Sequence, residues 1–293
     1  MTHKGRSFLG HFKKRPKKDR PLWVTLWVKK EKSMQRISSK DNSLIKHLKK
    51  LKEKKYREEY CEYVIEGIKL IKEAIQENAN IKQIVVCDGC DNSELIESHL
   101  KYEMAKIDFI YVPENIFKTI SDVESPQGIL AVIGKPNKEE INLDEDIILA
   151  LDDIQDPGNL GTILRTADSV GLKQILVSKG TADAFNPKVV RSTMGAIFRV
   201  KVIECEDLKH TLCDLQSKDY KVVCTSLNAK KNIYQIDYKK KVIVIGNEAN
   251  GVSKDIQNIA DEKVIIPMLG KTESLNASVA TGVILYEYVR QKM

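Results

Sequence analysis

The chain has no long hydrophobic run. Across its 293 residues, no stretch approaches the roughly 18 consecutive apolar residues that a membrane-spanning helix requires. The start of the chain also lacks a long apolar region followed by a small-residue cleavage site, so it is a poor match for a secretory signal. Apolar residues make up 42% of the chain and charged residues 30%, as in ordinary globular proteins. We therefore expect a soluble, cytoplasmic protein that does not contact a membrane.

Cysteine and histidine are also scarce. The chain has five histidines and six cysteines, and the cysteine spacing has no framework pattern. Cys87 and Cys90 form a single CxxC pair after an apolar run, with no second pair nearby to complete a zinc site. We interpret all six cysteines as reduced thiols. Because no cluster of histidine and cysteine accompanies the motifs described below, we expect no metal.

The positive charge is unevenly distributed. The net charge is +7, but residues 1–33 hold eleven basic and two acidic residues, and the remaining chain holds 37 basic against 39 acidic residues, a net of −2. Residues 1–33 are a disordered basic arm, a targeting sequence or an over-extended start before Met34, and they carry no fold prediction. A second basic stretch, 34–57, is predicted to contact RNA phosphates through Lys46, Lys49, Lys50, Lys54 and Arg57. The alternative is a solvated lysine-rich helix face.

Short apolar strands alternate with helical segments along the whole chain. This pattern predicts an α/β fold in two parts, a small domain over 34–140 and a larger one over 145–293, with a polar linker at 135–146. Helices are expected at 42–59, 68–76, 94–105, 114–120, 159–171, 187–195, 207–216 and 273–291. Strands are expected at 63–67, 81–87, 108–112, 128–134, 147–153, 174–178, 198–204, 220–226, 241–246 and 263–267. The second domain should contain a mostly parallel sheet with helices on both faces.

Three segments of the second domain are unusual for an α/β protein. In the first, 151–171, Pro157 and Gly158 turn the chain into a helix, and Asn159 lies near its N-terminus. Free N–H groups there favour an anion such as an RNA phosphate, which Arg165 could clamp with two hydrogen bonds. The alternative is a plain turn followed by a helix with a surface arginine.

The other two segments combine glycine loops with polar residues. In 242–253, a buried strand leads to Gly246 and Gly251, which bracket a loop containing Glu248. This sequence does not match GxGxxG, which argues against a dinucleotide-binding fold. It does not match GxxxxGK[ST] either, which argues against a loop that binds nucleotide triphosphates. In 264–287, a strand ends at Pro267, and a polar loop leads into a helix rich in small residues. Taken alone, this last segment could be a capped C-terminal helix.

Together the three segments resemble the motifs of the SpoU family of RNA ribose 2′-O-methyltransferases, also called TrmH-like, within the SPOUT superfamily. The matching stretches are DPGNLGTILRTAD, IGNEANGVS and IPMLGKTESLNASVA, in that order. The resemblance spans roughly 147–291. Residues 36–135 are similar to the family's small RNA-binding domain, which resembles ribosomal proteins.

The resemblance implies a C-terminal parallel-sheet domain whose chain is threaded into a trefoil knot. The knot loops would bind S-adenosylmethionine through the backbone around Gly246, Ile266 and Leu275, with Asn276 beside them. Two subunits of a homodimer would complete the active site. The remaining family positions fall on Asn159, Arg165, Glu248 and Ser274.

The implied reaction transfers a methyl group to a ribose 2′-hydroxyl, which is a poor nucleophile until it loses its proton. The family assigns the base role to the residue that is Arg165 here, yet arginine essentially never deprotonates in proteins. We therefore prefer the hypothesis that Arg165 stabilises the developing alkoxide and anchors a phosphate. Asn159 would orient the substrate or Arg165, while Glu248, Ser274 and Asn276 would organise the loops. His210, outside all three segments, is a poor candidate for a base.

Several alternatives remain open on the sequence. The chain could be an RNA-binding or ribosome-assembly protein without catalysis, or it could methylate a base instead of a ribose. It could also methylate ribosomal RNA as protection against an antibiotic. The separate N-terminal domain favours ribosomal RNA of the 23S type over transfer RNA as the substrate.

Overall fold

We describe the fold from a computed structural model in which residues 35–90, 107–137 and 140–293 are described. The expectations for residues 1–33 and for a helix at 94–105 lie outside these residues. None of the described helices is long and apolar enough to cross a membrane. Residues 35–293 form one compact unit that contains two separate sheets.

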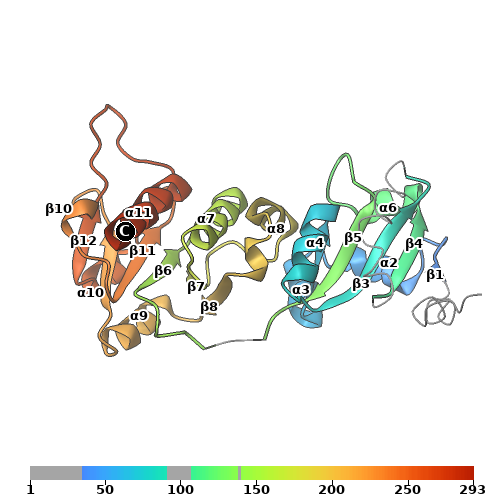
Figure 1. The fold of residues 1–293 in the computed structure, drawn as a ribbon, viewed down its shortest axis with the longest axis horizontal. Coiled ribbons are helices and arrows are strands. Elements are labelled where there is room, and N and C mark those ends of the chain that lie inside the picture. The colour runs from blue at the N-terminus through green and yellow to red at the C-terminus, as the bar shows by residue number, and fades with distance from the viewer. Residues whose placement is uncertain (1–34, 91–106, 138–139) are drawn as a thin grey trace, which may run out of the picture. The chain divides into compact units, whose positions relative to one another are not determined.

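The first sheet has five strands in the order β1-β4-β3-β5-β2 (Figure 1). The pairs β1–β4 and β3–β4 are parallel, whereas β5 pairs antiparallel with both β3 and β2. The strands are β1 (Gln35–Arg36), β2 (Glu62–Glu66), β3 (Ile81–Asp88), β4 (Phe109–Pro113) and β5 (Ile129–Gly134).

Helices cover both faces of this sheet. Successive side chains of a strand point to opposite faces, so alternate residues of β3 enter different cores. Ile84 and Val86 pack with α4 (Ile68–Gln76), whereas Val85 and Cys87 pack with α2 (Ser43–Lys50) and α6 (Glu114–Ile120). The short helix α3 (Lys54–Tyr60) connects α2 to β2.

The second sheet has seven strands, all parallel, in the order β10-β12-β9-β11-β6-β7-β8. Its central strands are fully buried apolar runs, as expected for a parallel sheet covered on both faces. The strands are β6 (Ile147–Asp152), β7 (Gln174–Ser178), β8 (Lys201–Cys205), β9 (Lys221–Thr225), β10 (Lys231–Asn232), β11 (Lys241–Gly246) and β12 (Glu262–Ile265).

This sheet also lies between two helical layers. Leu149 and Leu151 of β6 pack with α7 (Pro157–Ser169), α8 (Pro187–Thr193) and α11 (Ala277–Lys292). Ile148 and Ala150 pack instead with α9 (Leu208–Gln216) and α10 (Lys254–Ile259). Two short 3-10 helices, η2 (Ala196–Phe198) and η3 (Ile233–Gln235), complete the described elements. The expectation of a mixed α/β fold with a parallel second sheet is confirmed.

Two local expectations were wrong, and several short elements were not anticipated. The helix expected at 42–59 is broken into α2 and α3, because the Nη1 of Arg57 donates to the carbonyls of Leu51 and Lys52 at 2.8 and 2.7 Å where α2 ends. The strand expected at 198–204 starts only at Lys201, after η2. The helix α10, the short strands β1 and β10 and the two 3-10 helices were not anticipated.

Candidate active site

The first two motif segments meet where the central strands of the second sheet end. Strand β6 ends at Asp152 and β11 ends at Gly246, and these two residues are paired in register. Beyond them, the amide nitrogen of Asn247 donates to the carbonyl of Asp153 at 2.9 Å. The N–H of Ser253 donates to the buried carboxylate of Asp152 at 2.8 Å. Ligands of open parallel sheets bind at this carboxyl edge, so the loops lie where a site is expected.

A chain of side-chain hydrogen bonds joins all three motif segments. The amide nitrogen of Asn159 donates to Glu248 Oε1 at 2.9 Å, and the amide nitrogen of Asn276 donates to Asn159 Oδ1 at 2.9 Å. Asn159 therefore uses both ends of its amide, one toward each of the other two segments. The three residues are far apart in sequence, and the fold brings them into one group.

The carboxylate of Glu248 is the anionic member of this group. It also accepts the N–H groups of Gln155 and Asp156, each at 3.2 Å. Burial is the largest single influence on its pKa and raises it. The hydrogen bonds from Asn159, from the N–H of Glu248 itself and from the two N–H groups of Gln155 and Asp156 together outweigh burial. The pKa of Glu248 is consequently held below the ordinary glutamate value, and the group is anionic at neutral pH.

Asn276 also caps the N-terminus of α11. Its side-chain oxygen accepts the N–H of Ser278 at 2.9 Å and that of Val279 at 3.3 Å, so it is the N-cap of this helix. One amide group therefore fixes the helix start and the link to Asn159. The helix then packs against α7, where Gly282 faces Thr166.

At Gly246, the end of β11 packs directly against the backbone of a later segment of the same chain. A Cβ at this position would overlap backbone atoms of Gly251 and Val252. The same loop is closed by a hydrogen bond from the N–H of Gly251 to the carbonyl of Asn247 at 2.9 Å, and Gly251 has a φ of +68°. Both glycines of the second segment are thus required by the backbone path.

The loop between β12 and α11 offers its backbone to a ligand. Figure 1 draws it as a long open loop. Within the described structure, residues 268–275 make no hydrogen bond, although each carries backbone donors and acceptors. Ser274 is exposed, whereas Ile266 and Leu275 are partly buried. Free backbone groups beside apolar side chains fit a nucleoside-containing donor such as S-adenosylmethionine.

Arg165 projects from α7 into solvent. Its guanidinium has no hydrogen-bond or ion-pair partner among the described residues, so it is free to bind a phosphate. The arginine lies six residues after Asn159 on the same helix, whereas the other motif residues are held by one another.

The prediction of a phosphate site at the N-terminus of α7 is wrong. Asp156 is the N-cap of this helix, and its carboxylate accepts the N–H of Asn159 at 2.8 Å. Because Glu248 also accepts N–H groups just before the helix, two carboxylates already occupy the place of the anion. The sequence carries a signal for this cap, because an aspartate directly before a proline is a common helix start.

The basic stretch 34–57 is only partly available to RNA. Lys46 lies 3.1 Å from Asp41, Lys54 lies 3.6 Å from Glu58, and Lys50 donates to the hydroxyl of Tyr60 at 3.4 Å. All three of these lysines are exposed, and Lys49 is half-buried with no ion-pair partner in the described structure.

Arg57 does not fit the expected phosphate-binding role. Its side chain is only 2% exposed, and its guanidinium donates to Asp183 at 2.6 and 2.8 Å. Two backbone carbonyls accept from its Nη1, as described above. A phosphate cannot reach this group, and Arg57 instead ties the first sheet's helices to the second part of the chain.

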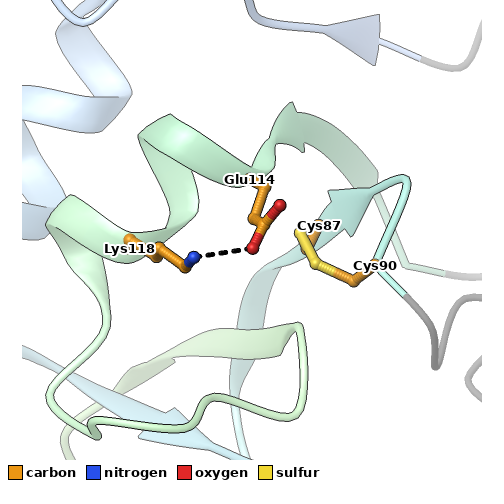
Figure 2. Close-up of a disulfide and its surroundings, with 4 residues drawn as sticks. All are labelled: Cys87, Cys90, Glu114 and Lys118. Atoms are coloured by element: carbon orange, nitrogen blue, oxygen red, sulfur yellow. Dashed lines mark ion pairs between the residues drawn. A yellow bond between two sulfur atoms is a disulfide. The ribbon is translucent and has the colours of Figure 1, made fainter.

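Cys87 and Cys90 were expected to be unremarkable thiols, and the structure corrects this. The two residues form a disulfide at the end of β3, which lies near the start of α6 and its Glu114–Lys118 ion pair (Figure 2). Gly128, with a φ of +80°, faces the disulfide, and a Cβ there would lie 3.3 Å from the Cβ atoms of both cysteines. The chain thus passes close to the disulfide at a glycine. No group of three metal-ligating side chains occurs in the described part of the chain.

We compared the chain with known protein families and proteins. Residues 146–286 match the model of the SpoU rRNA Methylase family, and residues 42–131 match the MRM3-like substrate binding domain. The chain is 33% identical over 254 residues to the 23S rRNA (guanosine(2553)-2′-O)-methyltransferase RlmP of Bacillus subtilis, covering 86% of this chain and 98% of that protein.

The chain belongs to the SpoU family of rRNA methylases. A second relative, the 23S rRNA (guanosine-2′-O-)-methyltransferase RlmB of Xanthomonas axonopodis, is 30% identical over 78% of this chain and 96% of its own length. Among solved structures, the SpoU methyltransferase AviRb of Streptomyces viridochromogenes in complex with the cofactor AdoMet has a TM-score of 0.78. That match has 25% identity and covers 86% of this chain and 98% of AviRb. The family expected from the three motif segments is confirmed.

Proposed function

We propose that this SpoU-family protein transfers a methyl group from S-adenosylmethionine to a ribose 2′-hydroxyl of a ribosomal RNA of the 23S type. The observation that carries the proposal is the hydrogen-bonded group of Asn159, Glu248 and Asn276, which holds the three family segments together at the carboxyl edge of the parallel sheet. A protein that had kept the fold only to bind RNA would not need these side chains to be linked.

The donor is proposed to lie against Gly246 and the loop 266–276. Free backbone groups of this loop would hydrogen-bond its adenosine part, with Ile266 and Leu275 as apolar contacts. When bound, the donor supplies an electrophilic methyl group. The neighbouring AviRb structure was solved with AdoMet, which supports this choice of donor.

Arg165 is proposed to hold the RNA phosphate next to the reacting ribose. A guanidinium keeps its proton at neutral pH, so it acts through its charge, stabilising the oxygen as its proton leaves. Its lack of protein partners leaves its fork of donors available for a phosphate. Asn159, with its amide taken up by Glu248 and Asn276, positions the α7 helix that carries Arg165.

The RNA-binding surface is proposed to include Lys46, Lys49, Lys50 and Lys54. Lys50 lies 5.1 Å from the ring centre of Tyr56, which stacks on Tyr60 at 6.1 Å between ring centres. Cations beside half-buried aromatic rings are typical of surfaces that bind phosphates and unstacked bases.

We further propose a homodimer, a knotted C-terminal chain and a cytoplasmic location. Three large apolar side chains remain exposed near the donor loop and on α11, namely Leu269, Val279 and Tyr286. Val279 and Tyr286 are seven residues apart and share one helix face. A second subunit that covers this face would bring its own residues to the site.

The proposal is tested by methyl transfer from labelled donor to total RNA, followed by mapping of the modified nucleotide. The expected product resists nuclease cleavage at one bond, because a methylated 2′-oxygen cannot attack the adjacent phosphate. Label in a base, or in transfer RNA alone, would contradict the proposed target. Titration calorimetry that detects no binding of S-adenosylmethionine would contradict the proposed activity as a whole.

A further inference from the structure

A cavity of about 350 Å³ lies between the two parts of the chain, away from the three motif loops. One wall is formed by the β2–α4 junction and the segment before β5, and the opposite wall by the end of α8. Its volume falls at the lower end of the range for ligand-binding pockets. The residues that carry the argument are Glu66, Lys69, Leu70, Gln127, Arg191 and Met194.

The cavity combines an apolar surface with unpaired cations. Among its lining residues, Leu70 is buried and Met194 is 43% exposed. Lys69 and Arg191 have no hydrogen-bond or ion-pair partner within the described structure. An apolar surface flanked by free cations suits a flat, weakly polar ring that carries a phosphate.

The acidic residues at the cavity are already engaged. Glu66 accepts the hydroxyl of Ser121 at 2.7 Å and the N–H of Asp122 at 3.2 Å. Glu73 binds Arg199 at 2.6 Å. The carboxylates are therefore held by protein donors, and the charge of Arg191 also acts on Glu66 without a hydrogen bond. Among the described residues, the hydrogen-bond donors of Lys69 and Arg191 stay available to a ligand.

Gln127 adds a group that can recognise a base edge. Its Oε1 accepts the N–H of Ile68 at 3.0 Å, and this bond fixes the orientation of the amide. The amide nitrogen has no partner among the described residues, so it is a free donor at the rim of the cavity. A fixed amide of this kind can hydrogen-bond the edge of a nucleobase.

The position of the cavity indicates what it binds. One wall belongs to the region that matches a substrate binding domain and the other to the region that matches the methylase family. A cavity lined by both regions is placed to contact a substrate that both regions hold. The α8 wall also meets the catalytic helix, because Ser192, next to Arg191, packs against Gly161 of α7, two residues beyond Asn159.

We propose that this cavity binds one unstacked nucleotide of the substrate RNA, distinct from the nucleotide that is methylated. The base lies against Leu70 and Met194, its edge meets the Gln127 amide, and its phosphate contacts Lys69 and Arg191. This inference rests on the proposed RNA substrate. The cavity would thereby add a second point of RNA recognition to the one at the reacting ribose.

The test compares two charge-matched pairs of substitutions. Lys69→Gln with Arg191→Gln removes the cations of the cavity. Lys72→Gln with Lys188→Gln is the control. It also removes one cation from α4 and one from α8, but neither residue lines the cavity. The affinity of each variant for unmodified, transcribed 23S ribosomal RNA is measured without methyl donor, so the result does not depend on turnover. We expect about a tenfold loss for the first pair and less than about twofold for the second. Equal losses would overturn the proposal.

A third variant tests the apolar surface without changing charge. Met194→Trp fills the cavity, and we expect a similar loss of RNA affinity with an unchanged affinity for S-adenosylmethionine and an unchanged melting temperature. RNA affinity equal to that of the wild type would overturn the proposal. If turnover fails in every protein while the cavity variants still lose RNA binding, only the proposed function fails.

A free nucleotide has the same base and phosphate groups as a nucleotide of the RNA, so it is tested as the alternative ligand of the cavity. AMP, GMP, CMP and UMP are tested by ligand-observed nuclear magnetic resonance against the wild type and the Lys69/Arg191 variant. We expect at most millimolar binding, because a single nucleotide lacks the contacts of the flanking RNA. Micromolar binding that is lost in the variant and does not compete with 23S RNA would overturn the proposal and assign the cavity to a free nucleotide.

Discussion

The amide nitrogen of Asn276 donates to the side-chain oxygen of Asn159 at 2.9 Å, across 117 positions of sequence. Because Asn159 in turn donates to Glu248, a single amide holds the segments after β6, after β11 and after β12 in one arrangement. Positioning of reacting groups is a large part of catalysis in a transfer reaction that needs in-line approach. The linked amides are thus a structural requirement of the site and have measurable consequences.

Replacing the central amide should disable the site without unfolding the protein. We expect Asn159→Ala to lower kcat/KM about a hundredfold, since a misplacement of about 1 Å at a reacting centre has effects of that size. The measurement is methyl transfer under saturating donor, with Asn228→Ala, an exposed loop amide, as the control. If Asn159→Ala retained wild-type activity, the link between the segments would have no catalytic role.

Arg165 should contribute to turnover much more than to donor binding. We expect Arg165→Ala to lower kcat by about 100- to 1000-fold, the range for loss of one group that stabilises a developing oxyanion. The Kd for S-adenosylmethionine, measured by calorimetry, should stay within about threefold of the wild type. An equal loss of donor affinity would place Arg165 in the donor site. A near-neutral limb in the wild-type pH–rate profile that disappears in Arg165→Ala would make it the base.

Glu248 should make the fold more stable at neutral pH than in acid. Its pKa is lowered in the folded chain, so its stabilising contribution is present above the ordinary glutamate pKa of about 4.3 and is lost as pH falls through the lower, folded value. We expect the melting temperature of Glu248→Gln to lie below that of the wild type at pH 7. Thermal unfolding between pH 7 and pH 3 should show this gap closing below about pH 4. A gap that is constant across this range would exclude the carboxylate as its cause.

The buried ion pair of Arg57 and Asp183 should matter for stability. Asp183→Ala leaves the guanidinium buried with only carbonyl partners, so we expect the free energy of unfolding to fall by about 3 kcal/mol. The exposed pair of Lys179 and Glu206 is the matched control, and Glu206→Ala should change stability by less than about 1 kcal/mol. Urea unfolding measures both. If the two variants lost similar amounts of unfolding free energy, burial of the Arg57–Asp183 pair would not increase its contribution to stability.

Lys49 should contribute to RNA affinity through its charge. It has no acidic partner in the described structure, so an RNA phosphate would be its first counter-ion. We expect Lys49→Gln to make the slope of log affinity against log salt shallower by about 0.7 to 0.9, the value for one phosphate contact. Lys209→Gln, on the exposed side of α9, should leave the slope unchanged. An unchanged slope for Lys49→Gln as well would place the RNA elsewhere.

Sequence patterns predicted the sheets and the motif residues well. Continuous apolar runs such as 147–152 and 241–246 are long enough to identify buried parallel strands, and both are confirmed. The grouping of Asn159, Glu248 and Asn276 followed from the family motifs. Which atoms of these residues bond to one another did not follow, because it depends on how three distant loops meet.

The misassigned residues have two different physical reasons. Arg57 stands among lysines in sequence, but its partner Asp183 lies 126 positions away, so its burial could not be seen from local charge. The Cys87–Cys90 disulfide is local, with Cα atoms 5.7 Å apart, but a single CxxC pair in a sequence does not distinguish a disulfide from two thiols. A contact between distant segments thus decided the first case, and local backbone geometry decided the second.

The strand order of the second sheet sets the timing of folding during synthesis. Strand β6 pairs along its full length with β11, which ends 94 residues later, at Gly246. Until then, one edge of a fully apolar strand has no partner on the growing chain, and such an edge is prone to aggregation. At translation rates of about 5–20 residues per second, the open edge persists for on the order of 5 to 20 seconds. A chain that stops between residues 152 and 241 therefore contains β6 without the strand that pairs with this edge.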